Sequence, residues 1–168
     1  MRILGVDPGL RVTGYAVISN SSSTLAGKAI DLVEAGIIRS KAQAGIAERL
    51  TSIHRALSAV VSELKPDVIV IEKLYAHYKH PTTAILMGHA RGAVCLVSGL
   101  SKIPLVSMAS THVKKAITGK GHASKWQVQR MVQHSLNLKR IPEPPDVADA
   151  LAIAIAYFFS LKKKGTWV

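Results

Sequence analysis

The chain has 168 residues, with 22 Lys and Arg against 10 Asp and Glu, which gives a formal net charge of +12. This length suffices for one domain with its own core, and the positive charge favours a polyanionic partner, nucleic acid ahead of a membrane surface. The one cysteine, Cys95, excludes an intrachain disulfide framework and a cysteine-based zinc site, and its surroundings AVCLVSG predict a place in the core.

Strands are predicted near residues 2–7, 13–19 and 29–38, because apolar and β-branched residues alternate there between the turn DPGLR and the polar loop NSSSTLAGK. These three strands can form an antiparallel meander. From about residue 45 to 64, apolar residues recur at three- and four-residue steps, which predicts a helix with one buried stripe. Residues 67–72 are nearly all apolar, as in a strand that helices cover on both faces.

The second half of the chain alternates helix and strand. A helix is expected from about 81 to 99, a strand at 104–107, shorter helices near 110–117 and 124–136, and a last helix from about 146. The order predicts an α/β fold with a mixed five-stranded sheet, three strands antiparallel and two parallel, and helices on its faces.

No membrane or export signal is predicted. The longest apolar run, Ala150 to Leu161, is too short to span a bilayer and predicts a buried helix. Only a few apolar residues follow Arg2 before Asp7 interrupts them, which does not match a signal peptide. We therefore expect a cytoplasmic protein without a membrane partner.

Four acids stand at the ends of predicted elements. Asp7 and Glu72 each close an apolar strand, so if these strands run parallel side by side, both acids lie on the edge where open α/β sheets bind ligands. Asp146 and Asp149 begin the last helix three residues apart and project from one face. If that face docks at the same edge, the four carboxylates converge, and such hard oxygen ligands select Mg²⁺ or Mn²⁺.

Each acid also has a purely structural interpretation. Asp7 before Pro-Gly can start a turn, Glu72 can be an edge charge, and Asp146 can be a helix N-cap. Asp149 differs, because it is expected within the first turn of an otherwise almost wholly apolar helix. The combination favours a functional site.

Five segments, in this order and spacing, carry a family resemblance over nearly the whole chain: DPGLRVTGYAVI, IEKLY, GHARG, VKKAITGKGHASKWQVQRMV and DVADALAIAIAY. Together they resemble the crossover-junction endodeoxyribonuclease (Holliday junction resolvase) RuvC family. The resemblance implies a ribonuclease H-like fold, one nuclease domain over residues 1–168 with a basic tail, and a homodimer that nicks two like strands of a four-way DNA junction during recombination and repair.

The resemblance also assigns a metal site. The family's four acidic ligands fall on Asp7, Glu72, Asp146 and Asp149, and two divalent ions, Mg²⁺ or alternatively Mn²⁺, would act in each active site to give 5′-phosphate and 3′-hydroxyl ends. A further hypothesis is that Asp7 bridges both ions. A branch-migration motor of the RuvA and RuvB type is the expected protein partner.

Basic residues match the family as well. Lys114 and Lys125 correspond to lysines near the scissile phosphate, where they would offset phosphoryl charge. Surface solubility is the alternative role for them. Salt-dependent backbone contacts are expected from the remaining basic residues of this region, Lys115, Lys120, Arg130, Lys139 and Arg140.

The stretch EKLYAHYKHPTT departs from the family, because it lacks the usual glutamine after the acid and is slightly longer. Tyr75 lies where the family carries an aromatic that stacks on junction bases, with a core tyrosine as the alternative. We expect the departure to alter junction contacts rather than the metal site. The nearby His77, His80 and His89 match no zinc pattern.

Gly88 and Gly92 are four residues apart, a spacing that allows close helix approach. The corresponding helix of the family lies in the dimer interface, although ordinary packing on the sheet would also use small residues. Two other functions stay open: a junction-binding module of the same fold that has lost catalysis and, ranked below it, an actin-like ATPase or kinase, which shares the strand ending in D-x-G.

Overall fold

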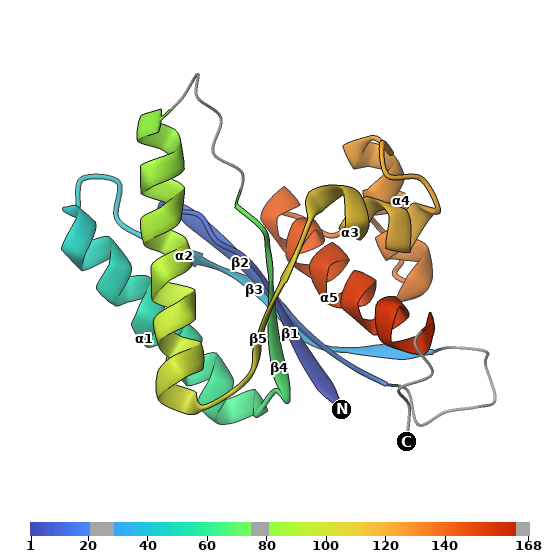
Figure 1. Ribbon diagram of the computed structural model, residues 1–168, viewed down its shortest axis with the longest axis horizontal. Helices are drawn as coiled ribbons and strands as arrows, with labels where there is room; N and C mark the ends of the chain where they lie inside the picture. The colour runs from blue at the N-terminus through green and yellow to red at the C-terminus, as the bar shows by residue number, and fades with distance from the viewer. Residues whose placement is uncertain (21–28, 75–80, 164–168) are drawn as a thin grey trace.

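The computed structural model describes residues 1–20, 29–74 and 81–163, which contain one five-stranded mixed sheet with helices on both faces (Figure 1). The strand order is β3-β2-β1-β4-β5. The first three strands form the predicted antiparallel meander, and β4 and β5 run parallel to β1. The strands are β1 (Arg2–Asp7), β2 (Val12–Asn20), β3 (Ile30–Arg39), β4 (Val68–Glu72) and β5 (Leu105–Met108).

Helices α1 and α2 cover one face of the sheet, and α3, α4 and α5 cover the other (Figure 1). Every element lies within two residues of its predicted bounds, so the predicted α/β class and sheet composition are confirmed. The helices are α1 (Ile46–Leu64), α2 (Pro81–Ser101), α3 (Ser110–Thr118), α4 (Lys125–Ser135) and α5 (Pro145–Lys163).

Alternation along the central strands divides the core into two layers. Successive side chains of a strand point to opposite faces. On β4, Val70 packs beneath α5, whereas Ile69 and Ile71 pack beneath α1 and α2. All three are fully buried, which explains why this strand is apolar on both sides until it reaches Glu72.

Helix α5 is the most deeply buried helix among those described. The run from Ala150 to Ala156 is buried without interruption, which confirms the buried helix predicted there. Two glycines explain its close approach to the sheet. A Cβ on Gly5 would stand 2.2 Å from the Ala150 carbonyl oxygen, and a Cβ on Gly14 would stand 2.1 Å from the Asp146 carbonyl oxygen. Only glycine therefore allows α5 to lie directly on β1 and β2.

Helix α2 buries one side and exposes an apolar opposite side. Ala90, Val94 and Val97 pack into the core, whereas Cys95 is exposed, so the prediction of a core cysteine is wrong. The run AVCLVSG supplies residues to both sides of the helix, and its hydrophobicity alone does not separate them. The exposed apolar residues of α2 are Ile85, Leu86, Met87, Leu96 and Leu100.

By length and composition alone, Thr82–Ser101 is also apolar enough to cross a membrane. Only 28% of that window is buried inside the domain, on the side of α2 that packs into the core. An added Cβ on Gly92 would meet no atom within 4 Å, so packing inside the chain does not require a glycine there.

Candidate active site

Asp7 and Glu72 end two neighbouring parallel strands. The register pairs Val6 of β1 with Ile71 of β4, so the acids that follow these two residues lie on the same edge of the sheet. A small cavity of about 210 Å³ is lined by both acids together with Asp149. The predicted convergence of the two strand ends is therefore confirmed.

Helix α5 brings the other two acids to this edge. Across the β1–β2 pair, Asp7 lies opposite Gly14, and the Asp146 backbone rests on that glycine. Asp146 is in the first turn of α5, whereas Asp149 is its fifth residue, one position beyond the first turn in which it was expected. The helix thus reaches the site because the strand beside Asp7 has no side chain at the point of contact.

Asp7 lies within the electrostatic influence of the other three carboxylates. Burial, followed by the negative charges of Asp149, Asp146 and Glu72, raises the pKa of Asp7 to about 6. Burial also raises the pKa of Glu72, although a hydrogen bond with the Ser110 side chain opposes that shift. A bound cation would compensate this concentration of negative charge.

Two lysines face the carboxylates. Lys125 is the first residue of α4, and its Nζ donates a hydrogen bond to Asp149 Oδ2 at 2.7 Å. This hydrogen bond raises the pKa of Lys125. Lys114 of α3 lines the same cavity as Asp7 and Glu72. Both lysines that the sequence placed near the scissile phosphate therefore lie at the acids.

The donor set suits a divalent metal, because it offers only carboxylate oxygens around a partly buried, mutually repelling cluster. Within residues 1–20, 29–74 and 81–163, no three His, Cys, Asp or Glu side chains already lie close enough together to hold an ion. Three carboxylates could share one cation only by drawing together. The acids therefore lie at one edge of the sheet, but three of them are not close enough together to coordinate the same metal ion.

Arg91 and Ser110 are site residues that the sequence reasoning did not identify. Arg91 of α2 donates from Nη1 to the Glu72 carbonyl oxygen at 2.5 Å and from Nη2 to Ser107 Oγ at 2.7 Å. It therefore ties the ends of β4 and β5 to α2. The motif GHARG contains Arg91, but no periodicity links it to a strand end that lies nineteen residues earlier.

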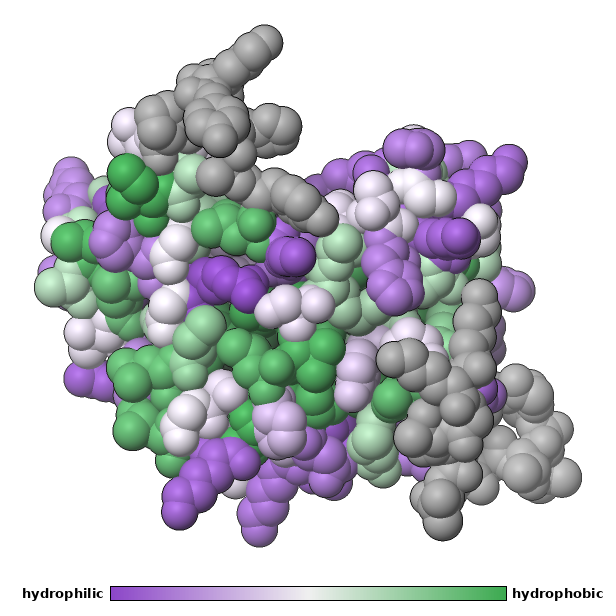
Figure 2. Space-filling model, viewed as in Figure 1, coloured by the Kyte–Doolittle hydropathy of each residue, from purple (hydrophilic) through white to green (hydrophobic). Residues whose placement is uncertain are grey.

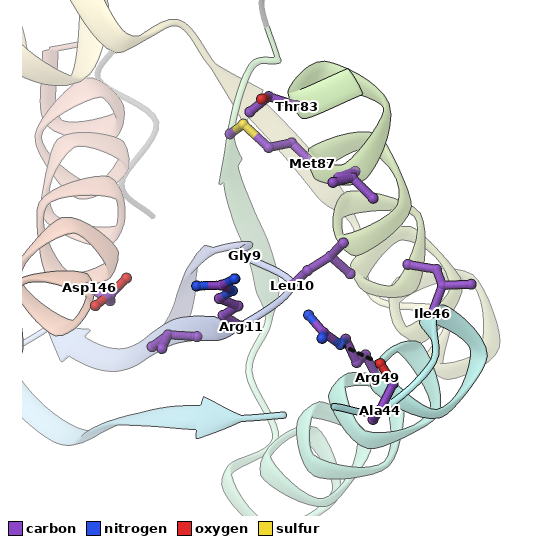
Figure 3. A pocket seen from close by; sticks show the side chains of 11 residues that line it. Gly9, Leu10, Arg11, Ala44, Ile46, Arg49, Thr83, Met87 and Asp146 are labelled. Atoms are coloured by element: carbon purple, nitrogen blue, oxygen red, sulfur yellow. Dashed lines mark hydrogen bonds between the residues drawn. The ribbon is translucent and has the colours of Figure 1, made fainter. Parts of the chain in front are cut away.

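A larger cavity, of about 680 Å³, lies on the Asp146 side of the site. Figure 3 shows Arg11 in the space between Asp146 of α5 and the helices α1 and α2. Arg49, the other arginine of this cavity, holds the chain before α1, because its Nε donates a hydrogen bond to the Ala44 carbonyl oxygen at 2.9 Å. Arg11 is exposed, and in Figure 3 its guanidinium lies between Asp146 and Arg49.

The model of the crossover junction endodeoxyribonuclease RuvC family matches residues 3–157. The chain belongs to the RuvC family. A RuvC of Rhodopirellula baltica is 48% identical over 153 residues, covering 91% of this chain and 83% of that protein. A RuvC of Pseudothermotoga lettingae is 44% identical over 154 residues, covering 92% of this chain and 91% of that protein. The predicted enzyme class, an endodeoxyribonuclease, is confirmed by this membership.

Solved structures agree with the family. The Thermus thermophilus RuvC structure has a TM-score of 0.86 and 30% identity, covering 99% of this chain and 98% of that one. The same organism's RuvC in complex with a Holliday junction substrate has a TM-score of 0.87 and 29% identity, covering 98% of this chain and 96% of that one. The expected ribonuclease H-like resolvase fold is confirmed.

The other basic residues expected to contact DNA are distributed around α3 and α4. Lys120 and Arg130 are exposed. Lys115 lines a separate cavity with His112 and Phe159, on a side of α3 away from the acids. Tyr75 lies outside the described residues, so its predicted stacking role stays a prediction.

Proposed function

We propose that this protein resolves four-way (Holliday) DNA junctions during recombination and repair by symmetrical, metal-dependent nicking. The observation that carries the proposal is the convergence of Asp7, Glu72 and Asp149 with Lys114 and Lys125 around one cavity. The RuvC of Thermus thermophilus has been solved with a Holliday junction substrate, and it covers nearly the whole of this chain. The substrate in this proposal is the one bound in the structure of that relative, a Holliday junction.

The metal ligands in this proposal are the carboxylates of Asp7, Glu72, Asp146 and Asp149. Two Mg²⁺ ions, or Mn²⁺ in their place, would supply an activated water and stabilise the leaving 3′ oxygen. Asp7 would be the central member of this ligand set, because it ends β1 in the middle of the sheet and the charges of the other three acids all act on it. The products are expected to carry a 5′-phosphate and a 3′-hydroxyl group.

Lys125 and Lys114 are the proposed phosphate ligands. The side chain of Lys125 is 59% exposed while its ammonium group contacts Asp149, so a phosphate can reach it from solvent. As negative charge develops on the phosphoryl oxygens, a positioned cation lowers the barrier. Lys115, Lys120 and Arg130, helped by the chain's charge of +12, would hold the DNA backbone in a salt-dependent way.

A homodimer through α2 would place two active sites on one junction. The exposed apolar side of α2 carries Ile85, Leu96 and Leu100, and Gly92 between them meets open space. Figure 2 shows apolar residues gathered over the α2 side of this face, whereas the end formed by α3 and α4 is mostly hydrophilic. A surface of this kind is buried by a partner in most soluble proteins.

Light scattering after size exclusion tests the dimer. The wild type is expected at twice the chain mass of 18.0 kDa, and the double variant Leu96→Glu, Leu100→Glu at 18.0 kDa. Leu32→Glu, on the exposed side of β3, is the control and should leave the dimer intact. A wild type that stays at the mass of one chain at every concentration would refute the dimer.

Substrate selectivity tests the proposed function. End-labelled four-way junctions and linear duplexes of the same sequence are incubated with the protein and Mg²⁺. Paired nicks at symmetrical positions in the junction, with the duplex intact, are the expected result. Junction binding without cleavage, across metals and junction sequences, would favour a non-catalytic module instead, and ATP turnover by the pure protein would revive the ATPase alternative.

A branch-migration motor of the RuvA and RuvB type is the proposed protein partner, and the cytoplasm is the proposed location. Both rest on membership of a family whose sequence relatives described above are bacterial. We also propose that residues 1–168 act as one nuclease domain, because both core layers pack on the same sheet.

A further inference from the structure

An aromatic side chain is exposed next to the candidate active site. Trp126 follows Lys125 directly in α4, and Lys125 contacts Asp149. Trp126 is 63% exposed, an unusual state for the largest apolar side chain. Arg130, one helical turn later, places its Cζ 5.7 Å from the centroid of the indole ring. The two side chains form a cation–π pair on the surface of the helix.

The pair stands on a fixed framework. Ser124 and Gln127 form a reciprocal capping box that fixes the start of α4. Val128 and Val132 anchor the other side of the helix in the core. The core does not need the indole ring, because these valines already supply the buried contacts of α4. We therefore expect the Trp126 side chain to contact a partner outside this chain.

The surroundings identify the chemistry of that partner. Arg130 is held by both the indole ring and Gln133, whose Oε1 accepts from Nη1 at 3.1 Å, yet it stays exposed. It keeps its positive charge, so it can bind an anion while Trp126 offers a flat apolar face. A phosphate beside a nucleobase presents this combination.

We propose that Trp126 and Arg130 form a strand-binding site for the DNA next to the cut. The indole ring stacks on an unpaired or splayed nucleobase, and the Arg130 guanidinium binds a phosphate of the same strand. The inference rests on the proposed function, because it takes Lys125 to contact the scissile phosphate and Trp126 is the next residue of α4. Successive helix residues are displaced by about 1.5 Å along the axis and turned by about 100° around it, so Trp126 stands on the side of α4 that adjoins Lys125, within reach of a strand that runs on from Lys125.

Tryptophan fluorescence tests the stacking directly. The chain has two tryptophans, Trp126 and Trp167, so Trp167→Phe leaves the indole of interest alone. Asp7→Asn is added to prevent cleavage. Titration with an unlabelled four-way junction should quench the emission and shield the indole from iodide, in parallel with binding followed by anisotropy of a labelled junction. Unchanged emission at saturated binding would overturn the proposal.

Affinity measurements separate stacking from charge. Trp126→Ala should weaken junction binding by roughly 5- to 10-fold, the lower part of the range for one stacked base, and Trp126→Phe should restore most of it. Because the indole is uncharged, the salt dependence of binding should not change. Arg130→Met should lower the slope of log affinity against log salt by about one. Equal losses for Trp126→Ala and Trp126→Phe would refute stacking.

The controls distinguish this site from the proposed function. Met131→Ala, an exposed apolar neighbour on α4, should bind junctions like the wild type. Thermal melting should show every α4 variant folded, since the truncated side chains are exposed. If the wild type cleaves junctions and Trp126→Ala matches it in affinity and rate, only the strand-binding site fails. If the wild type neither binds nor cleaves junctions, the proposed function fails and the strand-binding site fails with it.

Discussion

The carbonyl oxygen of Asp146 lies 2.1 Å from the position that a Cβ on Gly14 would occupy. Gly14 is also the residue opposite Asp7 in the β1–β2 pair. One glycine therefore sets how closely the helix carrying Asp146 and Asp149 approaches the strand carrying Asp7. The distance between the acids is a property of backbone packing as much as of side-chain choice.

Gly14→Ala should push α5 away from the sheet. Overpacking of this kind costs about 1–3 kcal/mol in the free energy of unfolding, and junction cleavage should fall further than stability does. Gly45→Ala is the control for added bulk, because an added Cβ there meets nothing within 4 Å and only the smaller cost of changing the N-cap of α1 is expected. Urea unfolding and single-turnover cleavage measure the two effects. A Gly14→Ala protein with wild-type stability and cleavage would refute the role of this contact.

Lys125→Met should lower the single-turnover cleavage rate by about 10²- to 10³-fold, because a positioned cation next to the phosphoryl group is lost. Stability should change by only about 1 kcal/mol, since the Lys125 side chain is largely exposed and Asp149 is partly buried. Lys115→Met removes the same charge from another side of α3, so it should weaken binding but leave the rate at saturating protein unchanged. Equal rates for the two variants would contradict the assignment of Lys125.

Asp7 should couple stability to pH in the metal-free protein. The pKa of Asp7 in the folded protein is about 6, above the ordinary value of 3.8. The folded state therefore favours the protonated carboxyl group. This contribution to the free energy of unfolding is fully present below pH 3.8 and is lost as the pH rises through 6. Above pH 6, Asp7→Asn should therefore raise the free energy of unfolding by on the order of 2 kcal/mol. Below pH 3.8 the gain should vanish.

Thermal melting across this pH range measures the effect, with Glu63→Gln as the exposed control. Added Mg²⁺ should stabilise the wild type above pH 6 and should not stabilise Asp7→Asn to the same degree, because a ligand must be deprotonated to bind metal. If Asp7→Asn raised the free energy of unfolding equally at every pH, the negative charge of the Asp7 carboxylate would not be what destabilises the wild type.

Arg91→Met should loosen the end of β4 that carries Glu72. We expect about a 10-fold rise in the Mg²⁺ concentration for half-maximal cleavage, as found for groups that orient metal ligands. Junction affinity should be unchanged, excess Mg²⁺ should restore the rate, and Arg91→Lys should be less impaired. Arg55→Met, on the exposed side of α1, is the control. A lower rate without any change in metal dependence would indicate a merely structural role.

The sequence was sufficient to place Asp7 and Glu72, because an apolar strand that ends on an acid is a local pattern. It was also sufficient for the element order, since the periodicities change from two to about 3.6 at the observed boundaries. Gly14 and Arg91 act between segments that are distant in the sequence, and such contacts leave no periodic signal.

Cys95 shows a second reason for error. Hydrophobicity marks the residues that avoid water, but α2 has an apolar side that meets the core and another that is exposed. The sequence does not distinguish a core from an association surface. Trp126 is another apolar residue of this kind, because its indole ring is exposed in the structure.

Single-turnover cleavage of a four-way junction by the wild type and Asp7→Asn, in Mg²⁺ and in EDTA, tests the central claim most directly. We expect the wild type to make paired nicks only with Mg²⁺, and Asp7→Asn to bind the junction without nicking it. Cleavage by Asp7→Asn at the wild-type rate, or wild-type cleavage in EDTA, would contradict a metal site built on this carboxylate.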